Sequence, residues 1–141
     1  MSTETIDGHN SRPQRERLPE TRPAITHKFE IADHDGYIVV GLYEDGRPGE
    51  VFLKIGKEGS TLGGLLDCVG ILTSVALQHG VPLETLVDKF SYVRFEPSGW
   101  TKNPDVHNAH SIVDYVFRWL GARFLESPNH DEAEEKEADD V

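Results

Sequence analysis

The chain is 141 residues long, which is enough for one compact domain and little more. Its formal net charge of −11 argues against a general nucleic-acid-binding protein, which needs a basic face. No run of about 20 apolar residues predicts a membrane span, and the polar start lacks the apolar core of a signal peptide. Cys68 is the one cysteine, which excludes a disulfide framework and a multi-cysteine metal site. These features predict a cytoplasmic protein without a nucleic-acid or membrane partner.

Charge and apolar content divide the chain into three parts. Residues 1–24 are polar and interrupted by prolines, so we expect a disordered N-terminal segment that includes a linker. Residues 128–141 are acidic and poor in apolar side chains, and we expect a disordered acidic tail. The folded domain is expected to span residues 25–127.

Three β-strands are predicted in the first half of the folded part. Residues 26–31, 37–43 and 51–55 are rich in β-branched and aromatic residues or alternate in polarity, and turn signals separate them. They are expected to form an antiparallel meander. An uncovered edge of such a sheet could pair with a second copy, so a homo-oligomer is left open.

Helical periodicity replaces the strand pattern after Ser60, which is a good N-cap residue. The first helix is expected to end at Gly80, which suits a C-cap position. The face that it is expected to bury consists of Leu62, Leu65, Leu66, Val69, Leu72, Thr73 and Ala76. Cys68 falls within this helix and is expected to pack in the core as a small hydrophobic side chain.

Two further helices complete the predicted fold. A short one follows Pro82, residues 92–95 are predicted to form a strand, and residues 109–125 form a last amphipathic helix. Strands followed by helices indicate the α+β class: an antiparallel β-meander of about three strands packed by two to three helices.

A glycine-rich turn leads into the first helix. Such a turn points backbone N–H groups and the positive end of the helix dipole at an anion. Lys57, Gly59, Ser60 and Thr61 are the candidate residues for this anion site. The run lacks the Gly-Lys-Ser/Thr ending of a P-loop, and an ordinary capped helix start is the favoured interpretation.

Residues 94–100 are the most informative short run. Arg94, Glu96, Ser98 and Trp100 place a cation, a carboxylate and an aromatic around a rigid Pro/Gly turn, as interaction loops do. The structural alternative has Trp100 covering the edge of the core and Arg94 paired with Glu96.

The remaining polar residues predict no catalytic, cofactor-binding or metal site. His107 and His110 lie three residues apart and could share a metal, but a surface pair is the favoured interpretation. No set of nucleophile, base and orienting group emerges from the spacing.

The longest distinctive runs are residues 41–50 (GLYEDGRPGE), 94–100 (RFEPSGW) and 111–120 (SIVDYVFRWL). With shorter runs between residues 15 and 125, they resemble the C-terminal region of vitamin B12-dependent (class II) ribonucleotide reductases. The matching part of that family is called the TSCPD domain. The five-letter motif behind this name does not occur in the chain.

The resemblance implies that a separate catalytic barrel holds the radical cysteine, the redox cysteine pair, the nucleotide sites and adenosylcobalamin. Reduction of a ribose needs three thiols, and Cys68 alone cannot serve as all of them. We therefore expect an accessory or detached C-terminal domain of an adenosylcobalamin-dependent ribonucleoside-diphosphate reductase. It would support deoxyribonucleotide formation for DNA synthesis beside a class II catalytic subunit, without being catalytic alone. The alternative is a stand-alone regulatory module that binds a nucleotide or a protein.

Overall fold

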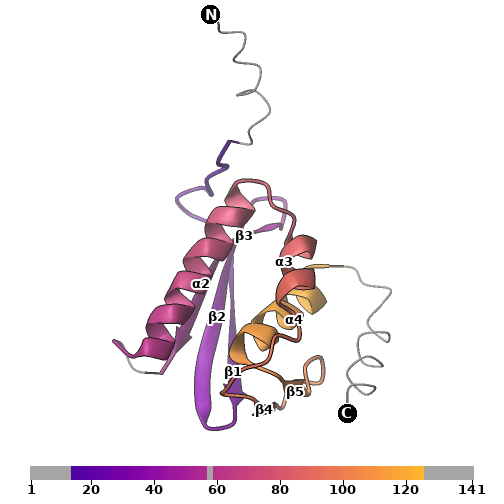
Figure 1. Ribbon diagram of the computed structural model, residues 1–141. Coiled ribbons are helices and arrows are strands. Elements are labelled where there is room, and N and C mark those ends of the chain that lie inside the picture. Colours follow the sequence, from indigo (N-terminus) through magenta and orange to yellow (C-terminus); the bar gives the residue numbers. More distant parts are fainter. Residues whose placement is uncertain (1–13, 57–58, 126–141) are drawn as a thin grey trace, which may run out of the picture. The chain divides into compact units, whose positions relative to one another are not determined.

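The computed structural model describes residues 14–56 and 59–125 (Figure 1). β1, β2 and β3 form an antiparallel sheet in the order β1-β2-β3, and β4 pairs antiparallel with β5. The predicted α+β fold is confirmed. The elements in chain order are β1 (Ala24–Ile31), β2 (His34–Leu42), β3 (Pro48–Ile55), α2 (Thr61–Gln78), α3 (Leu83–Phe90), β4 (Gly99–Trp100), β5 (Asn108–Ala109) and α4 (Ile112–Phe124).

The described residues divide into two compact units. Unit 1 holds the chain up to His27 together with Tyr37–Pro82, and unit 2 holds Lys28–Gly36 and the chain from Leu83 on. β1 and β2 therefore contribute residues to both units. The buried apolar core of unit 1 consists of Ile38, Val40, Tyr43, Val51, Leu53, Ile55 and Leu66.

In unit 1, α2 packs on β3 (Figure 1), and three of its four buried residues are small or polar. A Cβ atom at Gly70 would lie 2.9 Å from the carbonyl oxygen of Val51, so glycine permits this close approach. The backbone N–H of Val51 donates to Ser74 Oγ at 2.8 Å, and Gln78 Nε2 donates to the carbonyl oxygen of Gly49 at 2.9 Å. These bonds satisfy backbone groups that an edge strand leaves unpaired.

The sequence prediction for the buried face of this helix is correct for Leu66 and Thr73 but wrong for three other residues. Leu65 and Leu72 are 60% and 68% exposed, and Cys68 is exposed as well. The buried residues of α2 are Leu66, Gly70, Thr73 and Gln78. Helical periodicity assigns the most hydrophobic residues to the buried face. The close approach of α2 to β3 instead favours small side chains, and side chains that form hydrogen bonds with the strand, at this face.

The predicted ends of α2 are confirmed. The hydroxyl oxygen of Ser60 accepts from the N–H of Gly63 at 3.0 Å, which is an N-cap bond. At the other end, Gly80 follows the C-cap residue His79 with φ +89°, a conformation that glycine adopts without strain.

Within residues 14–56 and 59–125, α2 is the one helix long and apolar enough to cross a membrane. Its 18-residue window has a mean hydropathy of 1.4, and 22% of that window is buried. A single helix of this kind is weak support for a membrane span. The bonds that Ser74 and Gln78 form with β3 belong to a helix packed on a sheet.

The segment that precedes β1 is hydrogen-bonded into unit 1. The N–H of Glu16 donates to the carbonyl oxygen of Gln78 at 2.7 Å, and the hydroxyl of Tyr43 donates to the carbonyl oxygen of Glu16. The guanidinium of Arg22 forms two bonds with the carboxylate of Glu50. Part of the predicted linker therefore packs beside α2 and β3. The remaining residues of the two predicted disordered ends, 1–13 and 128–141, lie outside the described residues, as do residues 126–127 of the predicted domain.

In unit 2, the fully buried carboxylate of Asp114 on α4 collects four hydrogen bonds. It accepts from the backbone N–H of Tyr92 at 2.6 Å and from that of His110 at 2.8 Å. The guanidinium of Arg118, one helical turn later, binds both carboxylate oxygens at 2.9 Å. Arg118 also donates to the carbonyl oxygen of Asn108. Asp114 therefore joins α4 to the loops on either side of β4 and β5.

Around this carboxylate, three sequence predictions need correction. Residues 92–95 form no strand, because Tyr92 has φ +68° and its N–H is bonded to Asp114. The short strands β4 and β5 were not expected. The last helix begins at Ile112 rather than residue 109, because the hydroxyl of Ser111 caps it by accepting from the N–H of Asp114 at 2.9 Å.

We expect D114N to lower the free energy of unfolding by about 3–5 kcal/mol, because the nearly buried guanidinium of Arg118 would lose its anion. Urea unfolding of the full chain, followed by far-UV circular dichroism, measures this. The matched control D88N, at an exposed position of α3, should change the value by less than about 0.5 kcal/mol. Equal effects of the two variants would contradict the role given to Asp114.

Alkaline pH is expected to destabilise the fold through Tyr115. Burial raises the pKa of its phenol above the ordinary 10.0, and the hydrogen bond from Asn103 partly offsets this shift. Between pH 10 and the raised pKa, the folded state holds a proton that the unfolded chain has lost, so stability falls as the pH rises through this window. Y115F should make the decline of the melting temperature above pH 10 shallower. Y37F, at an exposed tyrosine, should leave that slope unchanged.

Candidate functional site

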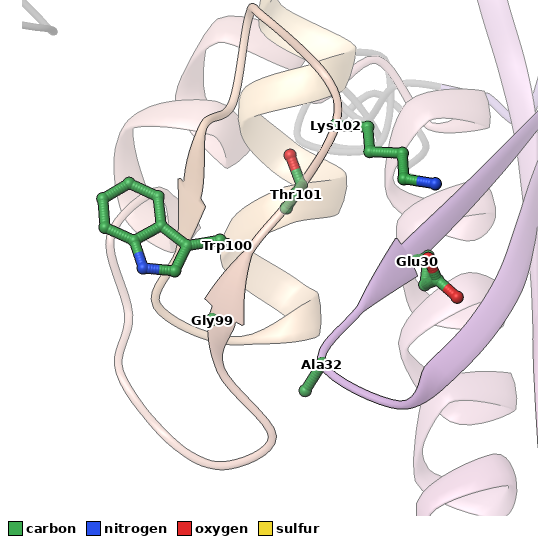
Figure 2. Close-up of a pocket in the computed structure, with 6 residues that line it drawn as sticks. All are labelled: Glu30, Ala32, Gly99, Trp100, Thr101 and Lys102. Carbon is green, nitrogen blue, oxygen red and sulfur yellow. The ribbon is translucent and has the colours of Figure 1, made fainter.

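A hollow in unit 2 lies beside an exposed tryptophan. Trp100 on β4 is 76% exposed, which is the largest exposure among the large apolar side chains of the described residues. The hollow has a volume of about 440 Å³. It is lined by Glu30, Ala32, Gly99, Trp100, Thr101 and Lys102 (Figure 2).

Backbone pairing holds Trp100 in place. Gly99 pairs with Ala109 and Trp100 with Asn108 in the β4–β5 ladder, and the N–H of Thr101 donates to the carbonyl oxygen of His107 at 2.8 Å. Gly99 has φ +148°, a conformation that favours glycine. The indole is therefore presented by an ordered hairpin rather than by a loose loop.

The loop between β4 and β5 is braced by its own polar side chains. The N–H of Asp105 donates to Asn103 Oδ1 at 2.9 Å, and Asn103 Nδ2 donates to the hydroxyl of Tyr115 on α4 at 3.0 Å. The hydroxyl of Thr101 donates to the carbonyl oxygen of Val106. These bonds tie the hairpin to the buried core of unit 2.

The side chains around the hollow do not converge on one point. Figure 2 shows the indole of Trp100 extending away from Glu30 and Lys102, which lie on the opposite side of β4. A planar ligand stacked on the indole would therefore not contact the ammonium of Lys102. Glu30 also adds a negative charge beside that ammonium, which disfavours a phosphate. An exposed indole on an ordered hairpin suits contact with another protein.

The four residues of the predicted interaction loop lie along one segment but have different partners. Arg94 Nη2 lies 3.5 Å from His110 Nδ1, and the hydroxyl of Ser98 donates to the carboxylate of Glu96. Trp100 alone among the four lines the hollow. Its exposure contradicts the alternative in which it covers the core edge, and the interaction loop stays a prediction.

The predicted anion site is partly outside the described residues, because Lys57 is not among them. Gly59 has φ +80° and precedes Ser60, whose hydroxyl is occupied by the N-cap bond. Thr61 is the first residue of α2 and is exposed. Helix capping explains Ser60, and the anion site stays a prediction.

The histidine pair is not the surface pair that the sequence suggests. His107 is exposed, but His110 is buried and its backbone N–H donates to the carboxylate of Asp114. In the part of the chain that the structure describes, no group of three or more His, Cys, Asp or Glu residues could hold a metal ion.

Sequence reasoning missed two features of the exposed surface. Glu30 and Ala32 line the hollow from the β1–β2 hairpin, far from Trp100 in the chain. The sequence also predicts that the outward apolar residues of α2 lie in the core, whereas they are exposed. A usable signal existed for α2, because Gly70 and Ser74 are four residues apart on the face that contacts β3.

Comparisons with known proteins agree on one family. The chain matches the TSCPD domain over residues 10–124. It is 57% identical over 122 residues to a vitamin B12-dependent ribonucleotide reductase of Rhodopirellula baltica, a match that covers 86% of this chain and 12% of the relative. A reductase of the same name from Streptantibioticus cattleyicolor is 54% identical over 114 residues, or 81% of this chain and 19% of the relative. One from Bradyrhizobium diazoefficiens is 41% identical over 113 residues, or 79% and 9%.

No solved structure matches the chain. The chain spans about an eighth of the length of the Rhodopirellula relative. The resemblance predicted from the sequence is confirmed by a match that covers most of the chain, and the protein belongs to the TSCPD domain family.

Proposed function

We propose that the chain is an accessory domain of an adenosylcobalamin-dependent ribonucleoside-diphosphate reductase and supports the reduction of ribonucleotides for DNA synthesis. The observation that carries this proposal is the 57% identity over 86% of the chain to a segment that makes up 12% of a reductase. Identity at this level includes surface residues as well as the core. This role would place the chain in the cytoplasm, as the sequence analysis expects.

The chemistry of the chain favours a supporting role. Ribonucleotide reduction takes up two electrons, which a pair of thiols supplies by forming a disulfide. Cys68 is the only cysteine in the sequence, so the chain cannot close a disulfide of its own. We therefore assign the thiols and the radical chemistry to a class II catalytic subunit.

The hollow beside Trp100 does not fit adenosylcobalamin. The hollow beside Trp100 has about 440 Å³, a size that suits a drug-sized molecule. A corrinoid is much larger. We therefore assign the cofactor to the catalytic partner as well, and give this chain a role in contact and assembly.

Trp100 is the residue that we expect to make this contact. Its indole is ordered by the β4–β5 pairing before any partner binds, which reduces the entropy lost on docking. Val93 and Phe95, earlier in the same segment, are exposed as well. Buried tryptophans carry a large share of the binding energy in protein interfaces.

A chimera tests the proposed function. The matched segment of the Rhodopirellula reductase is replaced by that of this chain, and deoxyribonucleotide formation is measured with adenosylcobalamin and a dithiol. We expect activity close to that of the parent and a loss of at least about tenfold when the segment is deleted. A chimera that is folded by circular dichroism but as inactive as the deletion would contradict the proposal.

In the active chimera, W100A is expected to lower the reductase activity by about tenfold or more, because a central interface tryptophan typically contributes at least 2 kcal/mol. F52A removes another exposed aromatic side chain, from β3, and serves as the matched control. Equal activities of the two variants would show that Trp100 makes no functional contact.

A stand-alone binding module is the second candidate, favoured by the hollow that Trp100 and Lys102 help to line. Trp119 is buried, so a change in tryptophan emission on ligand addition reports chiefly on Trp100. Titration of the chain with nucleoside diphosphates tests this candidate. A saturable change that W100F abolishes, together with an inactive chimera, would favour the module over the reductase role.

A further inference from the structure

The outward face of α2 carries a row of exposed apolar side chains. The α2 stripe consists of Leu65, Cys68, Leu72 and Val75, with Ile71 beside Leu72. Ile71 is 62% exposed and Val75 40%. The stripe is therefore a continuous apolar surface about 15 Å long at 1.5 Å per residue. Apolar side chains scattered singly need no explanation, but a contiguous patch marks an interaction site.

The α2 stripe carries no charge of its own. Asp67 is the only charged residue of α2, and one of its carboxylate oxygens lies 4.0 Å from Lys54 Nζ on β3. A charged partner such as a nucleic acid or an acidic peptide would find no complementary group on the stripe. The charge pattern therefore favours a second apolar, uncharged helix face as the occupant.

We propose that two copies of the chain pair through their α2 stripes as antiparallel helices. The intervals from Leu65 to Cys68, Leu72 and Val75 are three, four and three residues, which is the spacing of a coiled-coil seam. This spacing reads the same in both directions, so a two-fold axis at the level of Gly70 superimposes the stripe on itself. Leu65 then faces Val75 of the second copy.

The same register matches large side chains with small ones. Leu72 of each copy faces Cys68 of the other, so the most exposed side chain of the stripe meets the smallest side chain of the seam. The complementarity occurs twice, once on each side of the axis. A parallel pair would instead place Leu72 against Leu72 and Cys68 against Cys68 and would lose this match.

The size of the stripe sets the expected strength of pairing. A standard interface buries roughly 800 Å² per partner through 20–30 residues a side, and weak complexes bury less. Three helical turns offer less than the standard area, so we expect a dissociation constant of tens to hundreds of micromolar. The net charge of −11 on each copy opposes association, so added salt should strengthen the dimer.

Sedimentation velocity on the full chain tests the pairing. The concentration is raised into the upper micromolar range, with a reductant present so that a disulfide at Cys68 cannot join two copies. We expect a reversible dimer, at least about tenfold weaker in L72E than in the parent chain. F52E adds the same charge at an exposed position of β3 and should leave the dimer unchanged. A chain that stays monomeric at all concentrations would overturn the proposal.

A mixture of two variants tests the register. C68K and L72E are each expected to dimerise poorly alone, but the antiparallel register brings the new lysine of one chain against the new glutamate of the other. The mixture should therefore dimerise more strongly than either variant by about tenfold. A parent dimer without this gain would rule out the proposed register. Circular dichroism of each variant confirms that it is folded.

Two other occupants of the stripe are distinguishable outcomes. If the chain floats with neutral phospholipid vesicles, L72E abolishes this flotation and the chain alone stays monomeric, the occupant of the stripe is a membrane surface and not a second copy. If L72E abolishes the activity of the chimera and the chain does not self-associate, the occupant of the stripe is the rest of the reductase. Because the dimer is measured on this chain alone, a monomeric result would not contradict the proposed reductase function. An inactive chimera would likewise not contradict the proposed dimer.

Discussion

The buried carboxylate of Asp114 is the constraint on which unit 2 depends. Its oxygens bind the N–H groups of Tyr92 and His110, which lie at the two ends of the segment that contains β4, β5 and Trp100. Arg118 neutralises the charge within α4. Both ends of a long irregular segment are thus fixed to one turn of helix, and Trp100 keeps an ordered position although its side chain is mostly in solvent. The position of the candidate site is therefore a consequence of a bond made in the core.

Unit 1 is organised by a different constraint, the close approach of α2 to β3. Gly70 allows the two backbones to approach closely, and the side chains of Ser74 and Gln78 form hydrogen bonds with the backbone of the strand. Small or polar residues fill three of the four buried positions of α2, and Leu66 fills the fourth, so the other large apolar residues of the helix are less buried. The exposed stripe from Leu65 to Val75 follows from this geometry. The stripe is exposed because the face of α2 that covers the edge strand is occupied by residues that form hydrogen bonds with it.

The parts of the fold that local chemistry determines are predictable from the sequence. Alternation and turn residues predict the three-stranded sheet, and the cap residues Ser60 and Gly80 predict the limits of α2. The errors occur where a distant residue decides the local conformation. Tyr92 leaves the strand conformation because of a carboxylate 22 residues away. Trp100 can be selected as a candidate from its sequence context, but no local signal brings Glu30 and Ala32 to the same hollow.

The two exposed apolar surfaces have a common implication for function. Trp100 lies in unit 2 and the α2 stripe in unit 1, and each is held outward by hydrogen bonds rather than left there by poor packing. Exposed apolar surface of this kind favours aggregation unless a partner covers it. In the relatives, the matching segment makes up 9–19% of a reductase, so the rest of each relative is large enough to cover such surfaces. Under the two proposals made here, Trp100 would contact a catalytic partner and the α2 stripe a second copy, so substitutions in separate units should affect activity and self-association independently.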